Sequence, residues 1–222
     1  MRHLRGLRVE ALTELFKQTL GPCHDRFLLL PKSECTITHM ASTLSTSELR
    51  RPVVIDSAVH VFARSGYLGT AVAQVAAEAK ISTAYVFKLF PSKEQLFVAA
   101  LDHCFDLIEE ALAEGAASSA DQTPRGQLDA MGEAYADLIA NRSLLMLQVH
   151  AQSAADVPEI REALVRGLAR ITRFAKSRSG APDADVQRFI AFGQLCHLIV
   201  TTGLEEIDGD WARLLSEGIR HP

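Results

Sequence analysis

The sequence predicts an all-α protein, and two observations lead to this fold class. From Leu49 onward, apolar residues recur at spacings of three and four with little alternation, which is the period of amphipathic helices. Capping residues and breakers divide this region into segments of helix length. The 222 residues, 48% of them hydrophobic, suffice to bury a core. No apolar run reaches the roughly 18 residues of a membrane span, so we expect a soluble protein.

Residues 1–47 are predicted to form a flexible N-terminal extension. They contain a candidate helix over Leu4–Leu20, the breaker pair Gly21-Pro22 and a Ser/Thr-rich stretch over Ser42–Ser47. No closed hydrophobic pattern joins these pieces. Met40 lies inside the extension and is an alternative start of translation.

Residues 48–95 are predicted to form three helices. The first runs over Leu49–Ser65 and ends at Gly66, and Pro52 is tolerated only if it lies in the first turn. A short second helix follows Thr70, a suitable N-cap residue. After a tight turn, Ser82 caps a third helix of two turns.

Residues 96–222 are predicted to form a second helical domain. A long helix begins beside Ser92 and Gln95, which fit a capping box, and it reaches Gly115. Asp156 is expected to cap a helix that has Pro158 in its first turn. The remaining helices are predicted near residues 125–141, 143–154, 157–178, 183–203 and 208–219.

The cysteine and histidine pattern indicates neither a disulfide framework nor a metal site. The four cysteines, at positions 23, 35, 104 and 196, form no CxxC pair, so we expect ordinary thiols in a reduced, cytoplasmic protein. Cysteines that adjoin a histidine, such as Cys196 before His197, point about 100° apart on a helix and rarely chelate together. We find no paired base and nucleophile and no Gly-rich phosphate loop, so we expect no catalytic residues, no metal and no cofactor.

The helices of residues 48–95 have the outline of a helix-turn-helix unit, whose second short helix fits the major groove of DNA. Cationic, hydroxyl and small side chains on its outer side suit contacts with base edges and phosphates. Helix N-termini at Thr70 and Ser92 can aim backbone N–H groups at phosphates. The predicted DNA contacts are Thr70, Gln74, Ser82, Thr83, Ala84, Tyr85, Phe87, Lys88 and Lys93.

Three blocks in this region resemble the tetracycline-repressor (TetR) family of transcriptional regulators. They are Phe62–Tyr67, Thr70–Ala76 and Phe90–Phe97, and each keeps the family spacing. The resemblance implies an N-terminal three-helix DNA-binding domain and a C-terminal domain that binds a small effector and forms a homodimer. Phe87 departs from the family pattern, which usually has a tyrosine there whose hydroxyl touches a phosphate. Tyr85 is expected to supply a comparable contact rather than only to pack on the helix below.

The charges divide unevenly along the chain. Residues 48–95 hold six basic and four acidic side chains, whereas residues 96–222 hold 11 basic and 19 acidic ones. The overall charge of −4 therefore hides a basic unit, and the acidic part would repel DNA from other faces. We expect few phosphate contacts and a modest dependence of binding on salt.

Apolar and adaptable side chains on separate C-terminal helices could surround a pocket for a mostly apolar molecule. An ordinary core is the alternative for each of them taken alone. The predicted effector contacts are Phe105, Met131, Tyr135, Met146, His150 and Phe174.

A wide apolar band on the helix at 183–203 predicts a dimer interface. Its residues are Phe189, Phe192, Gly193, Cys196, Ile199 and Val200. The alternative is that the helix at 208–219, with Trp211 and Leu214, covers the band completely. A two-fold dimer would present two recognition helices to adjacent turns of the major groove, which implies a palindromic operator.

The resemblance implies a repressor that a small-molecule effector releases from its operator, by favouring another spacing of the two recognition helices. Two other functions remain open at this point. One is a dimeric DNA-binding regulator without an effector, which a filled core would favour. The other is a helical protein-interaction module that has lost DNA binding.

Overall fold

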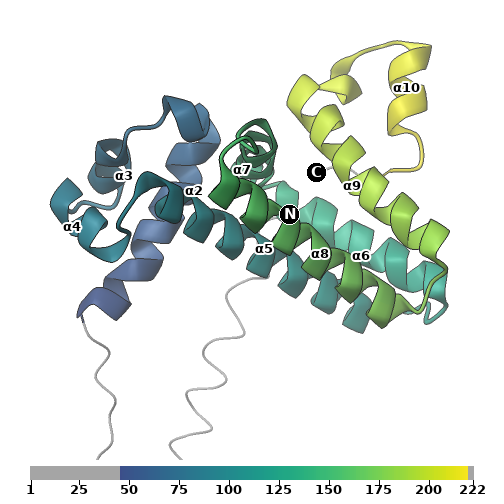
Figure 1. Cartoon of the computed structure of the whole chain (residues 1–222). Coiled ribbons are helices and arrows are strands. Elements are labelled where there is room, and N and C mark those ends of the chain that lie inside the picture. The colour runs from purple at the N-terminus through teal and green to yellow at the C-terminus, as the bar shows by residue number, and fades with distance from the viewer. Residues whose placement is uncertain (1–45, 220–222) are drawn as a thin grey trace, which may run out of the picture. The chain divides into compact units, whose positions relative to one another are not determined.

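The computed structural model of the chain describes residues 46–219, and every regular element in this range is a helix (Figure 1). The predicted all-α fold is confirmed for this range. The candidate helix over Leu4–Leu20, Met40, Cys23 and Cys35 lie outside the described residues. The elements are α2 (Thr46–Gly69), α3 (Val72–Glu78), α4 (Thr83–Leu89), α5 (Lys93–Ser118), α6 (Pro124–Ile139), α7 (Arg142–Ser153), α8 (Pro158–Ser179), α9 (Asp183–Thr202), the 3-10 helix η1 (Leu204–Glu206) and α10 (Asp210–Ser216).

Three predicted details of the helix starts are wrong. Helix α2 begins at Thr46, so Pro52 lies in its second turn. Pro52 is exposed and has no backbone N–H, so the helix lacks one hydrogen bond at this position. Thr70 does not cap α3: the N-cap is Ala71, whose N–H donates to the Gln74 side chain at 2.8 Å. Asp156 does not cap α8, because the helix begins one residue later, with Val157 before the φ-restricted Pro158.

The predicted serine caps are confirmed. Ser82 accepts a hydrogen bond from the Tyr85 N–H, and Ser92 accepts one from the Gln95 N–H, each at 3.2 Å. Each bond satisfies one backbone donor that a helix start leaves without a helical partner. The starts of α4 and α5, which flank the sharpest bends of the N-terminal region, are thereby fixed by their own sequence.

Gly66 interrupts α2 as predicted, with φ 67° and ψ 178°. This conformation favours glycine. The site is also crowded, because a Cβ atom at this position would lie 2.9 Å from Nδ1 of His150 on α7. The break therefore turns the chain toward α3 while keeping the end of α2 against α7.

Helix α5 is the central element of the core. It packs against α2, α6, α7 and α8, and its buried stripe runs from Leu96 to Ala116. Phe97 near its start is fully buried and lies edge-to-face with Phe62 of α2, with ring centroids 4.8 Å apart. One hydrophobic cluster contains residues of α2 to α9, so the same core supports residues on both sides of the domain boundary predicted at residue 95. The boundary itself stays a prediction.

The C-terminal helices α9 and α10 leave apolar side chains exposed. Gly203, with φ 66°, ends α9, and α10 follows after η1 (Figure 1). Phe192 and Leu198 of α9 are 43% and 49% exposed, and Leu214 of α10 is 74% exposed. Helix α10 therefore does not cover the apolar band of α9 completely. Within residues 46–219, no helix is both long and apolar enough to cross a membrane.

Candidate DNA-binding surface and effector cavity

The turn between α3 and α4 has the geometry of a Schellman motif. The N–H of Lys80 donates to Ala77 O at 3.2 Å, and the N–H of Ile81 donates to Ala76 O at 3.0 Å. Lys80 occupies the left-handed position with φ 55°, where glycine is the usual residue. The turn is thus closed by backbone hydrogen bonds, and it sets the direction in which α4 leaves.

Helix α4 is anchored on α2 by apolar and polar contacts. Val86 and Phe90 are buried completely or nearly so. Arg51 of α2 donates from Nη1 to the Leu89 carbonyl at 2.8 Å, and its guanidinium carbon lies 4.2 Å from the centroid of the Phe90 ring. A cation over an aromatic face adds to the burial energy. The orientation of α4 is therefore fixed from both its inner side and its C-terminal end.

The opposite side of α4 is accessible. Ala84, Phe87 and Lys88 are exposed, and Thr83 is partly exposed. Tyr85 is half-buried, and the Nζ atom of Lys88 lies 5.9 Å from the centroid of its ring. The sequence-predicted recognition residues thus share one helix and one exposed side, with Ser82 in its capping role at the start. Their contacts with DNA stay a prediction.

The other predicted DNA contacts already have neighbours within the fold. The Gln74 side chain is exposed but accepts the bond from Ala71 N–H. Thr70 is 2% exposed, and its hydroxyl has no partner among the described residues. The Nζ atom of Lys93 lies 4.6 Å from the centroid of the Tyr67 ring. Because the exposure of 2% includes the backbone, Thr70 presents almost no surface to a phosphate in this conformation.

Tyr67 and Glu94 join the end of α2 to the start of α5. The Tyr67 hydroxyl donates to Glu94 Oε1 at 2.5 Å, and the ring stacks edge-to-face on Phe97 with centroids 5.5 Å apart. Burial, followed by the bond to Glu94, raises the pKa of Tyr67 to about 12. The same bond holds the pKa of Glu94 below its usual range. This joint connects the helix-turn-helix to the helix that reaches the C-terminal region.

A cavity of about 400 Å³ lies among α5, α6, α8 and α9. Of the six predicted effector contacts, Phe105 and Tyr135 line it. Met131 is fully buried in the core, Met146 packs on a small cluster around Leu145, and Phe174 borders a separate shallow hollow on α8. His150 lies against Gly66 instead. The structure thus brings together two of the six residues.

Four residues of the predicted dimer interface also border this cavity. They are Phe189, Phe192, Gly193 and Cys196. Ile199 is fully buried, and Val200 is half-buried against the cluster around Leu145. Of the predicted interface residues, Phe192 has the most exposed side chain in the single chain. The apolar band of α9 therefore forms part of the cavity wall as well as part of the protein surface.

Tyr135 in the cavity wall has two polar partners, Gln148 and His197, that were not predicted from the sequence as part of a site. The Tyr135 hydroxyl lies 2.6 Å from Nε2 of His197 and 3.4 to 3.5 Å from the side-chain amide of Gln148. Gln148 and His197 are both 5% exposed. Burial lowers the pKa of His197 to about 4, so its ring is neutral at pH 7. Gln148 shares the buried stripe of α7 with Leu144 and Ala151, and a polar residue in such a stripe is a signal that could have revealed it.

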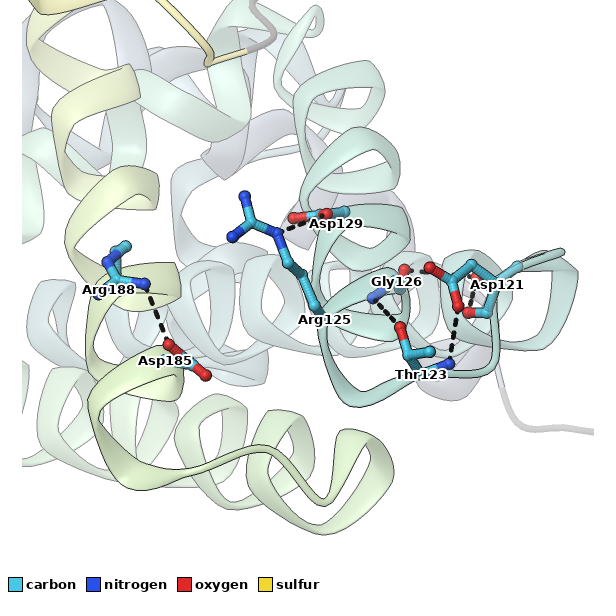
Figure 2. A network of polar contacts seen from close by, with 8 residues as sticks. Asp121, Thr123, Arg125, Gly126, Asp129, Asp185 and Arg188 are labelled. Carbon is cyan, nitrogen blue, oxygen red and sulfur yellow. Dashed lines mark hydrogen bonds and ion pairs between the residues drawn. The ribbon is translucent and has the colours of Figure 1, made fainter.

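The exposed end of the cavity carries charged side chains, and these form ion pairs with one another. Figure 2 shows Arg125 beside Asp129 on α6 and Arg188 beside Asp185 on α9, with nitrogen–oxygen distances of 3.6 and 3.0 Å. Nearby, Thr123 caps α6 by accepting from the Gly126 N–H at 3.1 Å, and Asp121 accepts from the Thr123 N–H at 2.9 Å. These bonds fix the start of α6, which positions Arg125 at the cavity.

The described cysteines are inert thiols. Among the described residues, Cys104 and Cys196 are buried and form no disulfide, and burial raises their thiol pKa values to about 12 and about 11. Within residues 46–219, no three His, Cys, Asp or Glu side chains are arranged to hold a metal ion.

Comparison with known proteins identifies the DNA-binding region. Residues 54–100 match the family described as bacterial regulatory proteins, tetR family. The chain is 37% identical over 57 residues to the HTH-type transcriptional regulator YuxN of Bacillus subtilis, and 32% identical over 65 residues to the HTH-type transcriptional regulator HbdR of Aromatoleum sp.. These matches cover 26% and 29% of this chain but only 20% and 28% of the two relatives.

Solved structures share the fold over most of the chain. One is the regulator FadR of Bacillus subtilis in complex with stearoyl-CoA, with a TM-score of 0.59, 19% identity, and coverage of 76% of this chain and 99% of that one. Another is a TetR-like regulator of Rhodococcus sp., with a TM-score of 0.56, 24% identity, and coverage of 78% and 93%. The three sequence blocks, the anchored helix-turn-helix and the family match agree: over residues 54–100, the chain carries a helix-turn-helix region of the tetR family of bacterial regulatory proteins.

Proposed function

We propose that the protein is a dimeric transcriptional repressor that binds a palindromic operator and leaves it when a small molecule occupies the cavity. The observation that carries DNA binding is the exposed side of α4, with Lys88 and Tyr85, on a helix anchored by Val86, Phe90 and Arg51. A rigid helix with an accessible polar and cationic side suits the major groove. The family consists of regulators and not of enzymes, and we expect a cytoplasmic protein.

Helix α5 supports a route from the cavity to DNA. Its start is joined to α2 through Glu94 and Phe97, and Phe105, Ile108 and Leu112 on the same helix line the cavity. Lys93 and Phe105 are separated by about 18 Å along the helix axis, from a rise of about 1.5 Å per residue. A molecule that displaces α5 would move the helix-turn-helix with it. Operator affinity would fall by the effector's differential affinity for the two states.

Exposed apolar side chains on α9 and α10 support a homodimer. Leu198, Trp211 and Leu214 are each about half or more exposed, and Phe192 lies on the same helix as Leu198. Such a surface is costly in water unless a second apolar surface covers it. A two-fold copy of the chain would do so and would pair the two α4 helices for adjacent half-sites.

Two other functions can be weighed against these features. A regulator without an effector would be expected to fill its C-terminal core, and the cavity of about 400 Å³ argues against it. A protein-interaction module that has lost DNA binding would not need an accessible cationic α4, so the exposed Lys88 argues against that function.

Operator binding by the full chain tests the proposal. A gel shift with the promoter of its own gene, at fixed salt, should show a sequence-specific complex. Tyr85→Ala and Lys88→Ala should each weaken it by about fivefold or more, since a good contact with base edges contributes about 1–3 kcal/mol. Arg178→Ala is the matched control, because it removes an exposed cation at the far end of α8. Unchanged binding by both α4 variants would refute the recognition helix.

A further inference from the structure

We propose that the effector is a slender, mainly apolar molecule with one uncharged hydroxyl or carbonyl group, which it places at Tyr135 and Gln148. This inference rests on the proposed function and specifies the chemistry of its ligand. The two ends of the cavity differ in exposure and in charge, and this difference indicates which ligand the cavity favours.

Each end of the cavity is marked by one residue of α6 and one residue of α9. Near the starts of these helices, Arg125 and Arg188 both line the cavity. About ten residues further along each helix, Tyr135 and His197 are in hydrogen-bond contact at 2.6 Å. The charged end and the polar end are therefore separated by about 15 Å, from the rise of about 1.5 Å per residue. An elongated molecule fits this arrangement better than a round one.

Most side chains that line the space between the ends are apolar, although Glu133 of α6 and Gln194 of α9 also border the cavity. Ile108 and Leu112 come from α5, and Phe189 comes from α9. The Phe105 ring completes the wall because Gly167 of α8 leaves room for it: a Cβ atom at Gly167 would lie 2.2 Å from the ring. Burying an alkyl segment here is favourable because it removes apolar surface from water.

The buried end favours a neutral group. It presents a phenol hydroxyl and a carboxamide, and the adjoining imidazole is neutral because burial lowers the pKa of His197 to about 4. Burial also raises the pKa of Tyr135 above its usual range. An ionised carboxylate placed here would lose its hydration without gaining an opposite charge, which disfavours its binding.

The same group has hydrogen-bonding capacity to offer a ligand. The bonds between Tyr135 Oη and the Gln148 amide measure 3.4 and 3.5 Å, beyond the usual range. The Gln148 side-chain nitrogen also donates to the Leu144 carbonyl at 3.2 Å, and its second hydrogen makes only the long bond to Tyr135. A hydroxyl or carbonyl oxygen at about 2.8 Å from Tyr135 or Gln148 would replace a long bond by a short one.

The exposed end does not select an acid. Arg125 and Arg188 face Asp129 and Asp185, so their charges are already balanced (Figure 2). All four side chains are exposed, and water screens what attraction remains. A carboxylate head group at this end would gain little over its hydration in water.

Calorimetric titration of the full chain with three probes of equal length tests the inference. The probes are 1-decanol, kept below its solubility limit, and decanoate and decylammonium, each kept below its micelle concentration, all at pH 7.4. We expect 1-decanol to bind at least about tenfold more tightly than either ion, equivalent to about 1.4 kcal/mol. Equal or tighter binding of decanoate would overturn the proposal, and so would the absence of 1-decanol binding.

Two variants test where the hydroxyl group of 1-decanol binds in the cavity. Tyr135→Phe and Gln148→Leu should each weaken 1-decanol binding by about threefold to tenfold, the range of one hydrogen bond. Gln187→Leu is the matched control, being the same substitution on an exposed side chain of α9 that does not line the cavity. Thermal unfolding checks that each variant folds. If Gln148→Leu does not fold, the affinity of Tyr135→Phe decides the test. Unchanged affinity in a folded variant would overturn the placement.

The gel shift separates failure of this inference from failure of the proposed function. Specific operator binding without 1-decanol binding would refute only the ligand chemistry. Binding of 1-decanol by a chain that binds no operator would refute only the regulator.

Discussion

The helix-turn-helix unit and the cavity region use their polar side chains in opposite ways. In the first, Arg51, Gln74 and Glu94 are engaged in bonds of 2.5 to 2.8 Å that hold helices in place. In the second, Tyr135 makes a short contact of 2.6 Å with His197, but its bonds to Gln148 measure 3.4 to 3.5 Å at the edge of an open space. The first region is built to present a rigid surface. In the ligand chemistry that we propose, the long bonds of Gln148 would be exchanged for a contact with the ligand.

Removing one aromatic ring from each region should give the largest difference in the free energy of unfolding. Phe97→Ala removes a fully buried ring that contacts both Phe62 and Tyr67, so we expect a loss of about 3–5 kcal/mol in the free energy of unfolding. Phe189→Ala removes a half-buried ring that already borders an open space, and it should cost much less. Urea unfolding at neutral pH measures both. Equal losses would show that the cavity region is packed as tightly as the joint.

The next contrast adds a methyl group instead of removing a ring. Gly167→Ala puts a Cβ atom 2.2 Å from the Phe105 ring, so we expect a loss of about 1–3 kcal/mol and weaker binding of 1-decanol as the ring shifts. Gly193→Ala is the control, since its Cβ would approach no atom closer than 3.8 Å. That variant should gain up to about 1 kcal/mol from helix propensity. Thermal unfolding and calorimetry measure the two effects, and a stabilised Gly167→Ala would contradict the close packing.

The same contrast explains how much could be predicted from the sequence. The caps at Ser82 and Ser92 and the break at Gly66 depend on residues within four positions, so local pattern sufficed. The start of α8 was missed by one residue because Asp156 and Pro158 both favour a helix start nearby. Pattern alone does not say which of two adjacent signals the fold uses.

The cavity could not be predicted from local pattern in the same way. Met131 and Phe105 have similar apolar surroundings in the sequence, yet Met131 is core and Phe105 lines the cavity. The difference arises from Gly167, which lies 62 positions further along the chain and accommodates the Phe105 ring. The polar contact of Tyr135 with His197 likewise joins two helices distant in sequence. Such arrangements depend on how helices pack, and a single sequence does not record that directly.

Removing the hydroxyl of Tyr67 tests whether the joint is held by its polar bond as well as by its rings. Tyr67→Phe keeps the stacking on Phe97 and loses the bond to Glu94, so we expect a loss of about 1–2 kcal/mol at pH 7. The folded-state pKa of Glu94 is lowered, so this stabilisation is present above its ordinary pKa of 4.5 and disappears as the pH falls through the lowered value.

Urea unfolding of both proteins between pH 3 and pH 7 measures this effect. The difference in stability should shrink on the acid side, because protonated Glu94 no longer attracts the hydroxyl as a charged acceptor. Glu94→Gln is the control, as it retains an acceptor oxygen without the charge and should remove the pH dependence. A difference that stays constant down to pH 3 would show that the ionised form of Glu94 does not matter.

The smallest expected effect is a gain, at the turn that aims the recognition helix. Lys80 has φ 55°, and this conformation costs a residue with a Cβ atom about 1–2 kcal/mol. Lys80→Gly removes that cost but adds backbone freedom to the unfolded chain, so the net gain should be about 0.5–1 kcal/mol in unfolding free energy. Lys80→Ala loses the same charge and keeps the strain, so thermal unfolding should show no comparable gain. If both variants were equally stable, the charge rather than the backbone would account for the effect, and the closed turn would not be under strain.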